Sequence, residues 1–327
     1  MSKLKGLLLT EGLHGMISQV EGLAKALDLE YFHEKIELNS FWNFIPPNLT
    51  PISKFVFKNQ PDRDFDIIIS CGRKSVIPSI YLKKNSKKKI INIHIQNPKI
   101  SFDKFDFIVA PDHDGLQGSN VYTSKGAIHY LTIEEINESR NYLENKIEKN
   151  KDVVSLILGG PTKHYNYADE NMINIFSKIN KNLINKNLQL IVIPSNRTPK
   201  KTINLAKEYF NKSRIVIDIV DKKAYLSSLA LSKYIVVTCD SSSMISEAAL
   251  TGKPIYVAMI PALKNDKRFK RFRNLFEKLN IIRNLDQEFE IWNYEKLDET
   301  NRIASEIKKK NKLNVFYNFN FKQFKKI

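Results

Sequence analysis

The 327-residue sequence contains only two cysteines, and it lacks any stretch of about 18 consecutive apolar residues that could cross a bilayer. Cys71 and Cys239 lie far apart, each at the end of an apolar run, which excludes a disulfide framework and indicates a reducing compartment. We expect two buried thiols rather than nucleophiles. The leucine run near the N-terminus, interrupted by Glu11, is too short for a signal peptide. We therefore expect a cytoplasmic protein, with any membrane contact peripheral and on the inner membrane face.

Two nucleotide-binding motifs are also missing. Neither a G-x-x-x-x-G-K-[ST] loop nor a G-x-G-x-x-G loop occurs, which argues against an ordinary P-loop NTPase and against a dinucleotide-dependent dehydrogenase. No known RNA- or DNA-binding module is present, so nucleic-acid binding would depend on charge alone, and we expect no nucleic-acid partner.

Acidic residues are scarce relative to basic ones: 35 against 52, a formal charge of +17. Such an excess favours an anionic partner, for example a phospholipid surface or a phosphorylated metabolite. Lys, Asn and Ile are used heavily all along the chain, however, so the surplus is equally compatible with a compositional bias and a solvated surface.

What is present is a rhythm of short apolar runs separated by helical patterns, as in repeated βαβ units. The expected strands are Gly6–Leu9, Leu29–Leu38, Asp66–Ser70, Ile90–Ile95, Phe105–Ala110, Asn120–Thr123, Val153–Leu158, Leu188–Ile193, Arg214–Ile217, Tyr234–Thr238 and Pro254–Ala258.

The domain organisation follows from length and from the character of these runs. Runs such as "DIIIS" and "YIVVT" do not alternate, which is typical of parallel strands covered by helices on both faces. The length favours two such domains. A charged helix running into a polar linker at 133–152 places the boundary near 150, giving domains 1–150 and 151–327. The last segment, 313–327, either packs back on the first domain or forms a surface-seeking tail.

In open α/β sheets ligands bind beyond the carboxyl ends of the strands, so the loops after strands are searched first. The most informative is "VVTCDSSSMISEAALTGKPIYV" (236–257), where a strand leads through Asp240 into Ser241, Ser242 and Ser243. A helix starting near Ser243 would offer free N–H groups and a positive dipole end to an anion. Glu247, one turn on, could accept hydrogen bonds from ribose; alternatively, Asp240 or a serine caps the helix and Glu247 is solvated.

The second loop, "LILGGPTKHYNY" (156–167), follows another apolar strand. Gly159 and Gly160 would let the backbone approach a ligand, and Thr162, Lys163 and His164 are suited to phosphate. A Gly-Gly-Pro turn required for steric reasons explains the glycines equally well.

Loops in the first half supply candidates for proton transfer and anion binding. His14, after the first strand, is placed to act as a general base, and a lone loop histidine can equally be incidental. Arg73 and Lys74 could bind an anion at a helix start. Asp112 and Asp114, which flank a histidine, could be acid/base groups or weak metal ligands, although we expect no metal site.

Two segments outside the strand pattern combine aromatic and basic residues. Residues 40–57 concentrate aromatics and prolines, and residues 263–279 form a predicted helix with phenylalanines on one face and basic residues mostly elsewhere. Both would suit an anionic membrane surface. For the helix, an ordinary core-facing amphipathic pattern is the alternative.

Six segments, taken together and in order, resemble those of the mitochondrial fission family named for the elongated-mitochondria plant mutant. They are "GMISQVEGLAKAL", "IISCGRKSV", "IHIQNPKI", "FDFIVAPDHDGL", "LILGGPTKHY" and "DSSSMISEAALTGKPIYV", and the likeness spans roughly residues 5 to 285. The resemblance implies a GT-B-like fold, with two Rossmann-like doubly wound domains facing each other across a cleft. The plant members recruit a dynamin-related GTPase to mitochondria, so the resemblance implies such an adaptor role as one possibility. The bacterial members have no established activity, so for them the resemblance implies the fold alone.

Within that superfamily, 243–254 resembles the donor-binding stretch of the lipid-linked N-acetylglucosamine transferase of peptidoglycan synthesis. This resemblance assigns the diphosphate to the helix start and the ribose to Glu247. The family commonly has Glu-Asn-Gln after Gly-His or Gly-Met, where this chain has Ile17-Ser18-Gln19, and Gln-Asp-Pro where it has Gln96-Asn97-Pro98. Labels calling some relatives sugar-nucleotide epimerases fit poorly, because a G-x-x-G-x-x-G loop is absent.

The leading hypothesis is a metal-independent GT-B-type glycosyltransferase that uses a nucleotide diphosphate sugar as co-substrate and needs no other cofactor. Its acceptor would be a lipid-linked sugar or another molecule, and His14, Asp112 or Asp114 would remove the acceptor proton. The alternative is a non-catalytic adaptor that acts through protein or membrane-surface contacts.

Overall fold

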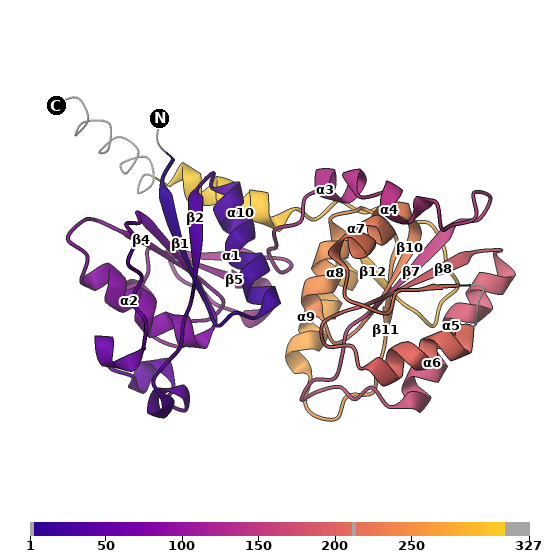
Figure 1. Cartoon of the computed structure of the whole chain (residues 1–327), viewed down its shortest axis with the longest axis horizontal. Helices are drawn as coiled ribbons and strands as arrows, with labels where there is room; N and C mark the ends of the chain where they lie inside the picture. Colours follow the sequence, from indigo (N-terminus) through magenta and orange to yellow (C-terminus); the bar gives the residue numbers. More distant parts are fainter. Residues whose placement is uncertain (1–2, 211–213, 311–327) are drawn as a thin grey trace. The chain divides into compact units, whose positions relative to one another are not determined.

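The computed structural model describes residues 3–210 and 214–310, which form two compact units (Figure 1). The first contains the chain up to Tyr130 and resumes at Asp298, and the second is Leu131–Leu297. The division therefore falls earlier than the expected boundary near 150. The reason is that the segment after Tyr130 packs on the second unit, where Leu143 is fully buried and its N–H donates to Ser227 Oγ at 3.0 Å.

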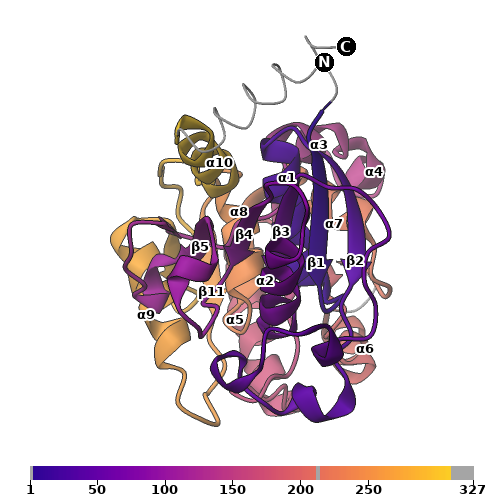
Figure 2. The same cartoon turned by 90° about the vertical axis from the view of Figure 1, so that its left-hand side faces the viewer.

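The first unit is built on a six-stranded parallel sheet with the order β2-β1-β3-β4-β5-β6, and Figure 2 shows β2 to β5 in this order from right to left. The strands are β1 (Lys5–Thr10), β2 (Glu30–Lys35), β3 (Ile67–Cys71), β4 (Ile91–Ile95), β5 (Phe107–Pro111) and β6 (Val121–Ser124). The helices are α1 (His14–Ala26), α2 (Val76–Lys84) and α10 (Glu299–Lys309). Short 3-10 turns are η1 (Ser40–Asn43), η2 (Pro47–Leu49), η3 (Lys54–Val56), η4 (Arg73–Ser75), η5 (Phe102–Lys104) and η6 (Asp112–Asp114).

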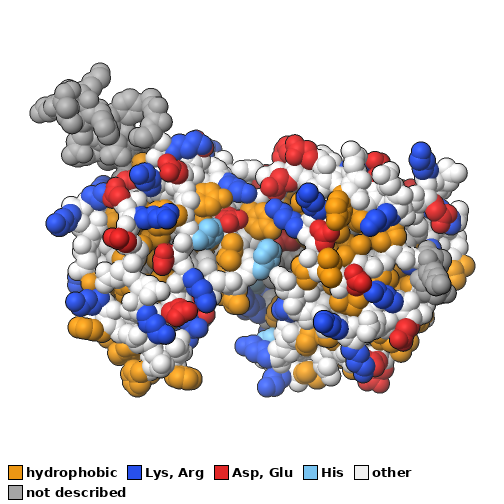
Figure 3. Space-filling view, viewed as in Figure 1, with side chains coloured by type: hydrophobic (Ala, Val, Ile, Leu, Met, Phe, Trp, Pro, Cys, Tyr) orange, Lys and Arg blue, Asp and Glu red, His pale blue; other side chains and the backbone are white. Residues whose placement is uncertain are grey.

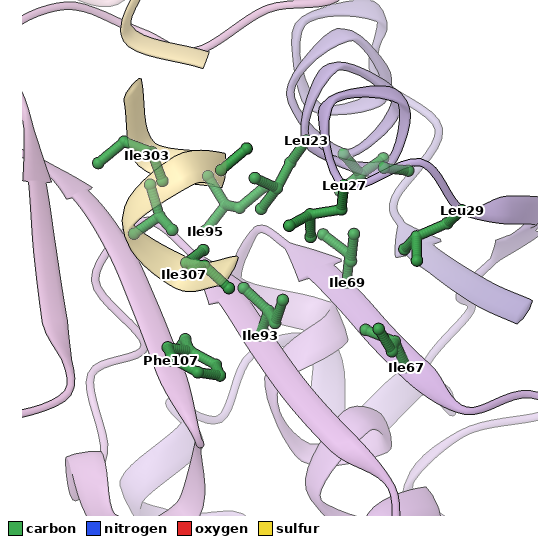
Figure 4. Close-up of a cluster of buried hydrophobic side chains, with 14 of the residues drawn as sticks. Leu23, Leu27, Leu29, Ile67, Ile69, Ile93, Ile95, Phe107, Ile303 and Ile307 are labelled. Carbon is green, nitrogen blue, oxygen red and sulfur yellow. The ribbon is translucent and has the colours of Figure 1, made fainter. Parts of the chain in front are cut away.

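Strand side chains alternate between two buried clusters, which explains the apolar runs without alternation. On one face Leu8 and Ile69 pack with α1 and α10, and on the other Leu7 and Leu9 pack with α2. Figure 4 shows Ile303 and Ile307 of α10 reaching the same cluster as Leu23 and Ile93. Helix α10 thus completes the core of a unit from which it is more than 160 residues distant in sequence. The aromatic segment 313–327 lies outside the described residues.

The second unit has its own six-stranded parallel sheet, with the order β12-β11-β10-β7-β8-β9. Its strands are β7 (Val153–Leu158), β8 (Gln189–Pro194), β9 (Ile215–Val216), β10 (Ser232–Thr238), β11 (Ile255–Ala258) and β12 (Ile282–Asn284). Its helices are α3 (Ile133–Glu138), α4 (Asn141–Glu144), α5 (Asp169–Asn185), α6 (Lys200–Phe210), α7 (Lys222–Leu231), α8 (Ser242–Ala249) and α9 (Lys267–Lys278). Because β7 pairs with both β8 and β10, the loops after these three strands are neighbours.

Two parallel doubly wound sheets confirm the expected fold class, and within residues 3–210 and 214–310 eleven of the twelve strands lie where the apolar runs predicted them. The strand that the sequence analysis missed is β12, a three-residue edge strand containing Arg283. Among the described residues, no helix has both the length and the apolarity needed to cross a membrane.

Candidate functional site

Asp240 connects the loops that follow β7, β8 and β10. Its carboxylate is completely buried and accepts from the Arg197 guanidinium at 2.8 Å, from the Gly160 N–H at 3.1 Å and from the Tyr167 hydroxyl at 2.5 Å. Arg197 also donates to the Gly160 carbonyl at 2.8 Å. An ionised carboxylate surrounded by donors makes charge-assisted hydrogen bonds, so this network fixes Arg197 against the carboxyl edge of the sheet.

The two glycines after β7 are required by close approach of these neighbours. A Cβ on Gly159 would lie 2.2 Å from Asp240 Oδ2, and a Cβ on Gly160 would lie 2.0 Å from the Arg197 carbonyl oxygen. The Gly159 N–H donates to Thr238 Oγ1 at 2.8 Å. The steric explanation of the glycine pair therefore holds, because the room beside their backbone is filled by the chain's own atoms.

Helix α8 begins at Ser242, two residues after Asp240 and close to the expected start. Ser241 is its N-cap, and the side chain accepts from the Met244 N–H at 3.4 Å. The hydroxyls of Ser242 and Ser243 are half-buried and hydrogen-bond to none of the described residues. Of the two alternatives left open for capping, a serine is the cap, and Asp240 is instead the ligand of Arg197.

Glu247 lies one turn into α8 and is half-buried against α7. Its Oε2 accepts from the Tyr225 hydroxyl at 2.7 Å. Burial raises the pKa of this carboxyl to about 7, and the Tyr225 hydrogen bond opposes part of that rise. Glu247 is therefore not the freely solvated helical residue that was the alternative interpretation.

The raised pKa of Glu247 predicts a pH-dependent contribution to stability. Between pH 4.5 and about 7 the folded protein holds a proton that the unfolded chain releases, so the free energy of unfolding falls as pH rises through this window. Glu247→Gln should remove this decline. The difference in unfolding free energy between the variant and the wild type should therefore be more favourable to the variant at pH 8 than at pH 5. We expect this change to be on the order of 1 kcal/mol, a figure reduced because the side chain is partly exposed. Denaturant unfolding at both pH values checks it, with exposed Glu208→Gln as the control.

The remaining residues of the 156–167 loop differ in exposure and role. Lys163 is exposed and has no ion-pair partner in the described part of the chain. Thr162 Oγ1 accepts from the N–H groups of His164 and Tyr165 at 3.1 and 3.2 Å. The hydroxyl of Thr162 thus shapes the turn, and Lys163 is the side chain that the loop leaves available.

A hydrogen-bonded triad of two buried residues and the half-buried Asp266 holds this loop against the start of α9. Tyr165 donates to Asp266 at 2.6 Å, and Arg273 donates to both at 3.0 and 2.9 Å. Arg273 is only 7% exposed, so it lies on the buried face of α9, unlike most of the basic residues of this helix. Phe272 and Phe276 are also buried, which makes α9 an ordinary amphipathic helix with an exposed basic side.

The anion-binding candidates of the first unit are occupied by the protein itself. Arg73 donates to the backbone carbonyls of Asn43 and Ile45. Lys74 forms an ion pair with Glu11 at 3.3 Å. Neither cation is presented as a free anion ligand, because each already neutralises or tethers a neighbouring loop.

The three candidate bases lie in the first unit, and two of them are exposed. His14 is the first residue of α1, exposed, with its ring edge-on to Tyr130 at 6.1 Å. Asp112 is exposed in the turn η6, whereas Asp114 is half-buried with Oδ1 at 3.8 Å from His113 Nε2. Among residues 3–210 and 214–310, no three His, Cys, Asp or Glu side chains are grouped so that they could hold a metal ion.

The cysteines are as expected. Cys71 and Cys239 are both buried free thiols, and burial raises the pKa of Cys239 to about 11. Burial also raises the pKa of the Cys71 thiol, and a buried thiol with a raised pKa is a poor nucleophile at neutral pH.

Sequence reasoning missed Arg197 and the anchoring role of Asp240. Arg197 lies in "PSNRTPK" immediately after β8, so it occupies the same kind of strand-to-helix loop as the residues that were identified. The available signal was therefore its position after an apolar strand, whereas its partner lies 43 residues further along the chain.

Two Rossmann-like units, each with a six-stranded parallel sheet and interleaved helices, define a GT-B-like fold. The family model for mitochondrial fission ELM1 matches residues 14–311. The chain therefore belongs to the mitochondrial fission ELM1 family, as its six segments predicted.

Two curated relatives agree with this membership. An uncharacterized protein of Rickettsia prowazekii is 27% identical over 76% of this chain and 80% of its own length. The mitochondrial fission protein ELM1 of Arabidopsis thaliana is 22% identical over 74% of this chain, and the match spans 63% of the plant protein.

Among solved structures, the UDP-GlcNAc 2-epimerase of Methanocaldococcus jannaschii is similar to this chain, with a TM-score of 0.50 and 15% identity, covering 93% of this chain and 99% of that one. At this identity the likeness is one of fold alone. The chain has no G-x-x-G-x-x-G loop, yet its fold is similar to that of a protein named as an epimerase. The missing loop therefore does not exclude every epimerase fold.

Proposed function

We propose that the second unit binds a nucleotide diphosphate sugar at the carboxyl edge of its sheet, and that the chain is a GT-B-type glycosyltransferase. The observation that carries the proposal is the α8 N-terminus, with two half-buried serine hydroxyls unbonded to described residues, adjoining an arginine that Asp240 holds in place. Free N–H groups, hydroxyls and a guanidinium are what a diphosphate requires.

In this proposal the diphosphate lies at Ser242 and Ser243, with Arg197 and Lys163 as its cations. The Arg197 side chain is 42% exposed although its anchor is buried, so N–H groups remain for a ligand. Glu247 accepts from the ribose hydroxyls. The helix dipole and the two cations balance the charge on the leaving nucleoside diphosphate, and this is why we propose that no metal is needed.

The fold likeness supports a nucleotide-sugar partner, because the similar M. jannaschii protein is named for a UDP-sugar substrate. For the transfer step, His14 is our preferred base, with Asp112 and Asp114 as alternatives. The base would take the proton of an acceptor hydroxyl as that oxygen displaces the nucleoside diphosphate from the sugar. We propose that the acceptor is a lipid-linked sugar and that the protein is cytoplasmic.

Thermal unfolding with UDP and with UDP-GlcNAc tests the donor site. At 100 times its dissociation constant a ligand should stabilise the wild-type protein by about 2.7 kcal/mol. Arg197→Ala and Glu247→Ala should each lose most of the shift, measured against their own ligand-free midpoints. Lys207→Ala is the matched control, because Lys207 is a paired cation of the same unit with 43% exposure.

The outcomes separate the two hypotheses. A shift that Arg197→Ala and Glu247→Ala leave intact would remove the donor assignment while keeping nucleotide binding. If no nucleoside diphosphate or its sugar shifts the midpoint, the glycosyltransferase proposal fails, and the non-catalytic adaptor with a protein partner becomes the better account.

A further inference from the structure

The connection between β2 and β3 is an exposed loop with a fixed base. An antiparallel bridge between Leu38 and Phe57 closes it, and both of these side chains are buried. Between them the chain forms the three turns η1, η2 and η3. Val56 is also buried in the core of the first unit. The loop is therefore part of the folded unit.

Four large apolar side chains of this loop are nevertheless exposed: Phe41 at 66%, Phe44 at 85%, Leu49 at 69% and Phe55 at 73%. We call these four side chains, three phenylalanines and one leucine, the aromatic platform. Figure 3 shows hydrophobic side chains at the lower end of the first unit. Side chains exposed to this extent protrude from the surface, so they cannot line a groove that receives a peptide. Several exposed large apolar residues within 15 positions indicate an interaction surface.

Hydrogen bonds hold the platform in shape. Arg73 donates to the Asn43 and Ile45 carbonyls, and Asn39 Nδ2 donates to the Phe55 carbonyl at 2.7 Å. Thr50 Oγ1 donates to the Pro46 carbonyl at 2.9 Å. Because hydrogen bonds already order the backbone of the loop, binding through these side chains costs little additional backbone conformational entropy.

The charge of the segment favours one kind of partner. From Leu38 through Pro61 the sequence has no acidic residue, and its two charged side chains are Lys54 and Lys58. Lys58 forms an ion pair with Glu37 at 3.5 Å, just before the segment, so Lys54 is the cation that the loop leaves available. Lys54 Nζ lies 5.5 Å from the Phe55 ring centroid, so a cation is held beside an exposed aromatic. A second copy of the chain would bring two Lys54 side chains together, which is unfavourable, whereas an anionic lipid headgroup complements Lys54.

We propose that the aromatic platform docks the first unit on an anionic lipid membrane, with the aromatic rings in the interfacial region and Lys54 at the headgroups. This surface is independent of the proposed nucleotide site, which lies in the second unit.

Flotation with vesicles tests the proposal, using phosphatidylcholine alone and phosphatidylcholine with phosphatidylglycerol. Wild type should partition onto the anionic vesicles. Phe41→Ser/Phe44→Ser/Phe55→Ser should reduce the partition coefficient by about tenfold or more, since each ring loses its apolar contact with lipid. The thermal midpoint should stay unchanged, because these rings are not in the core. Lys54→Glu should weaken binding to anionic vesicles, and added salt should reduce the difference.

The matched control is Ile184→Ser/Ile219→Ser, which removes two exposed apolar side chains, 69% and 68% exposed, from the second unit. It should bind like wild type. Trp42 gives an independent readout because its ring centroid lies 4.9 Å from that of Phe41. If Phe41 enters the membrane, brominated lipids should quench the fluorescence of Trp42. The other tryptophan, Trp292, is buried in the second unit.

Three results would overturn the proposal. The first is equal vesicle binding by the triple variant and wild type, and the second is equal reduction by the isoleucine control. The third is a wild-type protein that does not bind vesicles and has a larger mass by light scattering than the platform variant. The platform would then be a contact between copies of the chain. Nucleotide-induced thermal shifts should be the same in all platform variants.

Discussion

Gly160→Ala should destabilise the protein by about 3 kcal/mol or more, because the added methyl group meets a rigid neighbour. A Cβ at this position would lie 2.0 Å from the Arg197 carbonyl oxygen and 2.3 Å from its carbon, both backbone atoms that no rotamer change can move. Relief requires the loop after β8 to shift, which would pull Arg197 away from Asp240. Urea unfolding should show a lower midpoint with an unchanged slope, and UDP should no longer raise the thermal midpoint.

Gly15→Ala is the control for Gly160→Ala. Gly15 lies in the first turn of α1, and nothing lies within 4 Å of the position its Cβ would occupy. Alanine there should be neutral, or stabilising by about 0.5–1 kcal/mol, because it favours helix. A Gly160→Ala protein as stable as Gly15→Ala would mean that the two loops are not packed as described.

The local features of the candidate site could be predicted from the sequence. The start of α8 follows from an apolar run ending in Asp240 and three serines, and its end follows from Gly252, which has a φ of +74° as a residue closing a helix does. Each of these signals lies within a few residues of the feature it determines. The strands were predictable for the same reason, because burial on both faces leaves unbroken apolar runs.

The features that escaped prediction depend on contacts between distant parts of the chain. The division into units was placed late because Leu143 is buried on α7, and no local pattern encodes that choice. Lys253 lies in the turn between α8 and β11, yet its Nζ donates to the carbonyls of Leu229 and Ala230 at the end of α7, a contact that the local sequence does not indicate. Arg197 was missed because "SNRTP" has the composition of an exposed loop. Its functional role depends on the contact with Asp240, which is distant in sequence.

Asp240→Ala should lower the free energy of unfolding by about 3–5 kcal/mol, because a buried ionic partner is removed and its donors stay behind. The Gly160 N–H, the Tyr167 hydroxyl and one Arg197 bond all lose their acceptor. Asp240→Asn should cost about 1–3 kcal/mol, since an amide retains one oxygen but offers N–H groups where the protein already supplies donors. Denaturant unfolding at pH 7 measures both.

Asp152→Ala is the matched control, because Asp152 also pairs with a cation of the second unit, Lys233 at 2.6 Å, but is 51% exposed. That change should cost about 1 kcal/mol or less. A double-mutant cycle then tests the geometry: the Cβ of Gly159→Ala clashes with the Asp240 carboxylate itself, at 2.2 Å. Removing that carboxylate makes room for the methyl group, so Gly159→Ala/Asp240→Ala should be less destabilised than the sum of its parts. Strict additivity would show that Asp240 does not lie against the glycine pair, and the anchoring of Arg197 would then have to be abandoned.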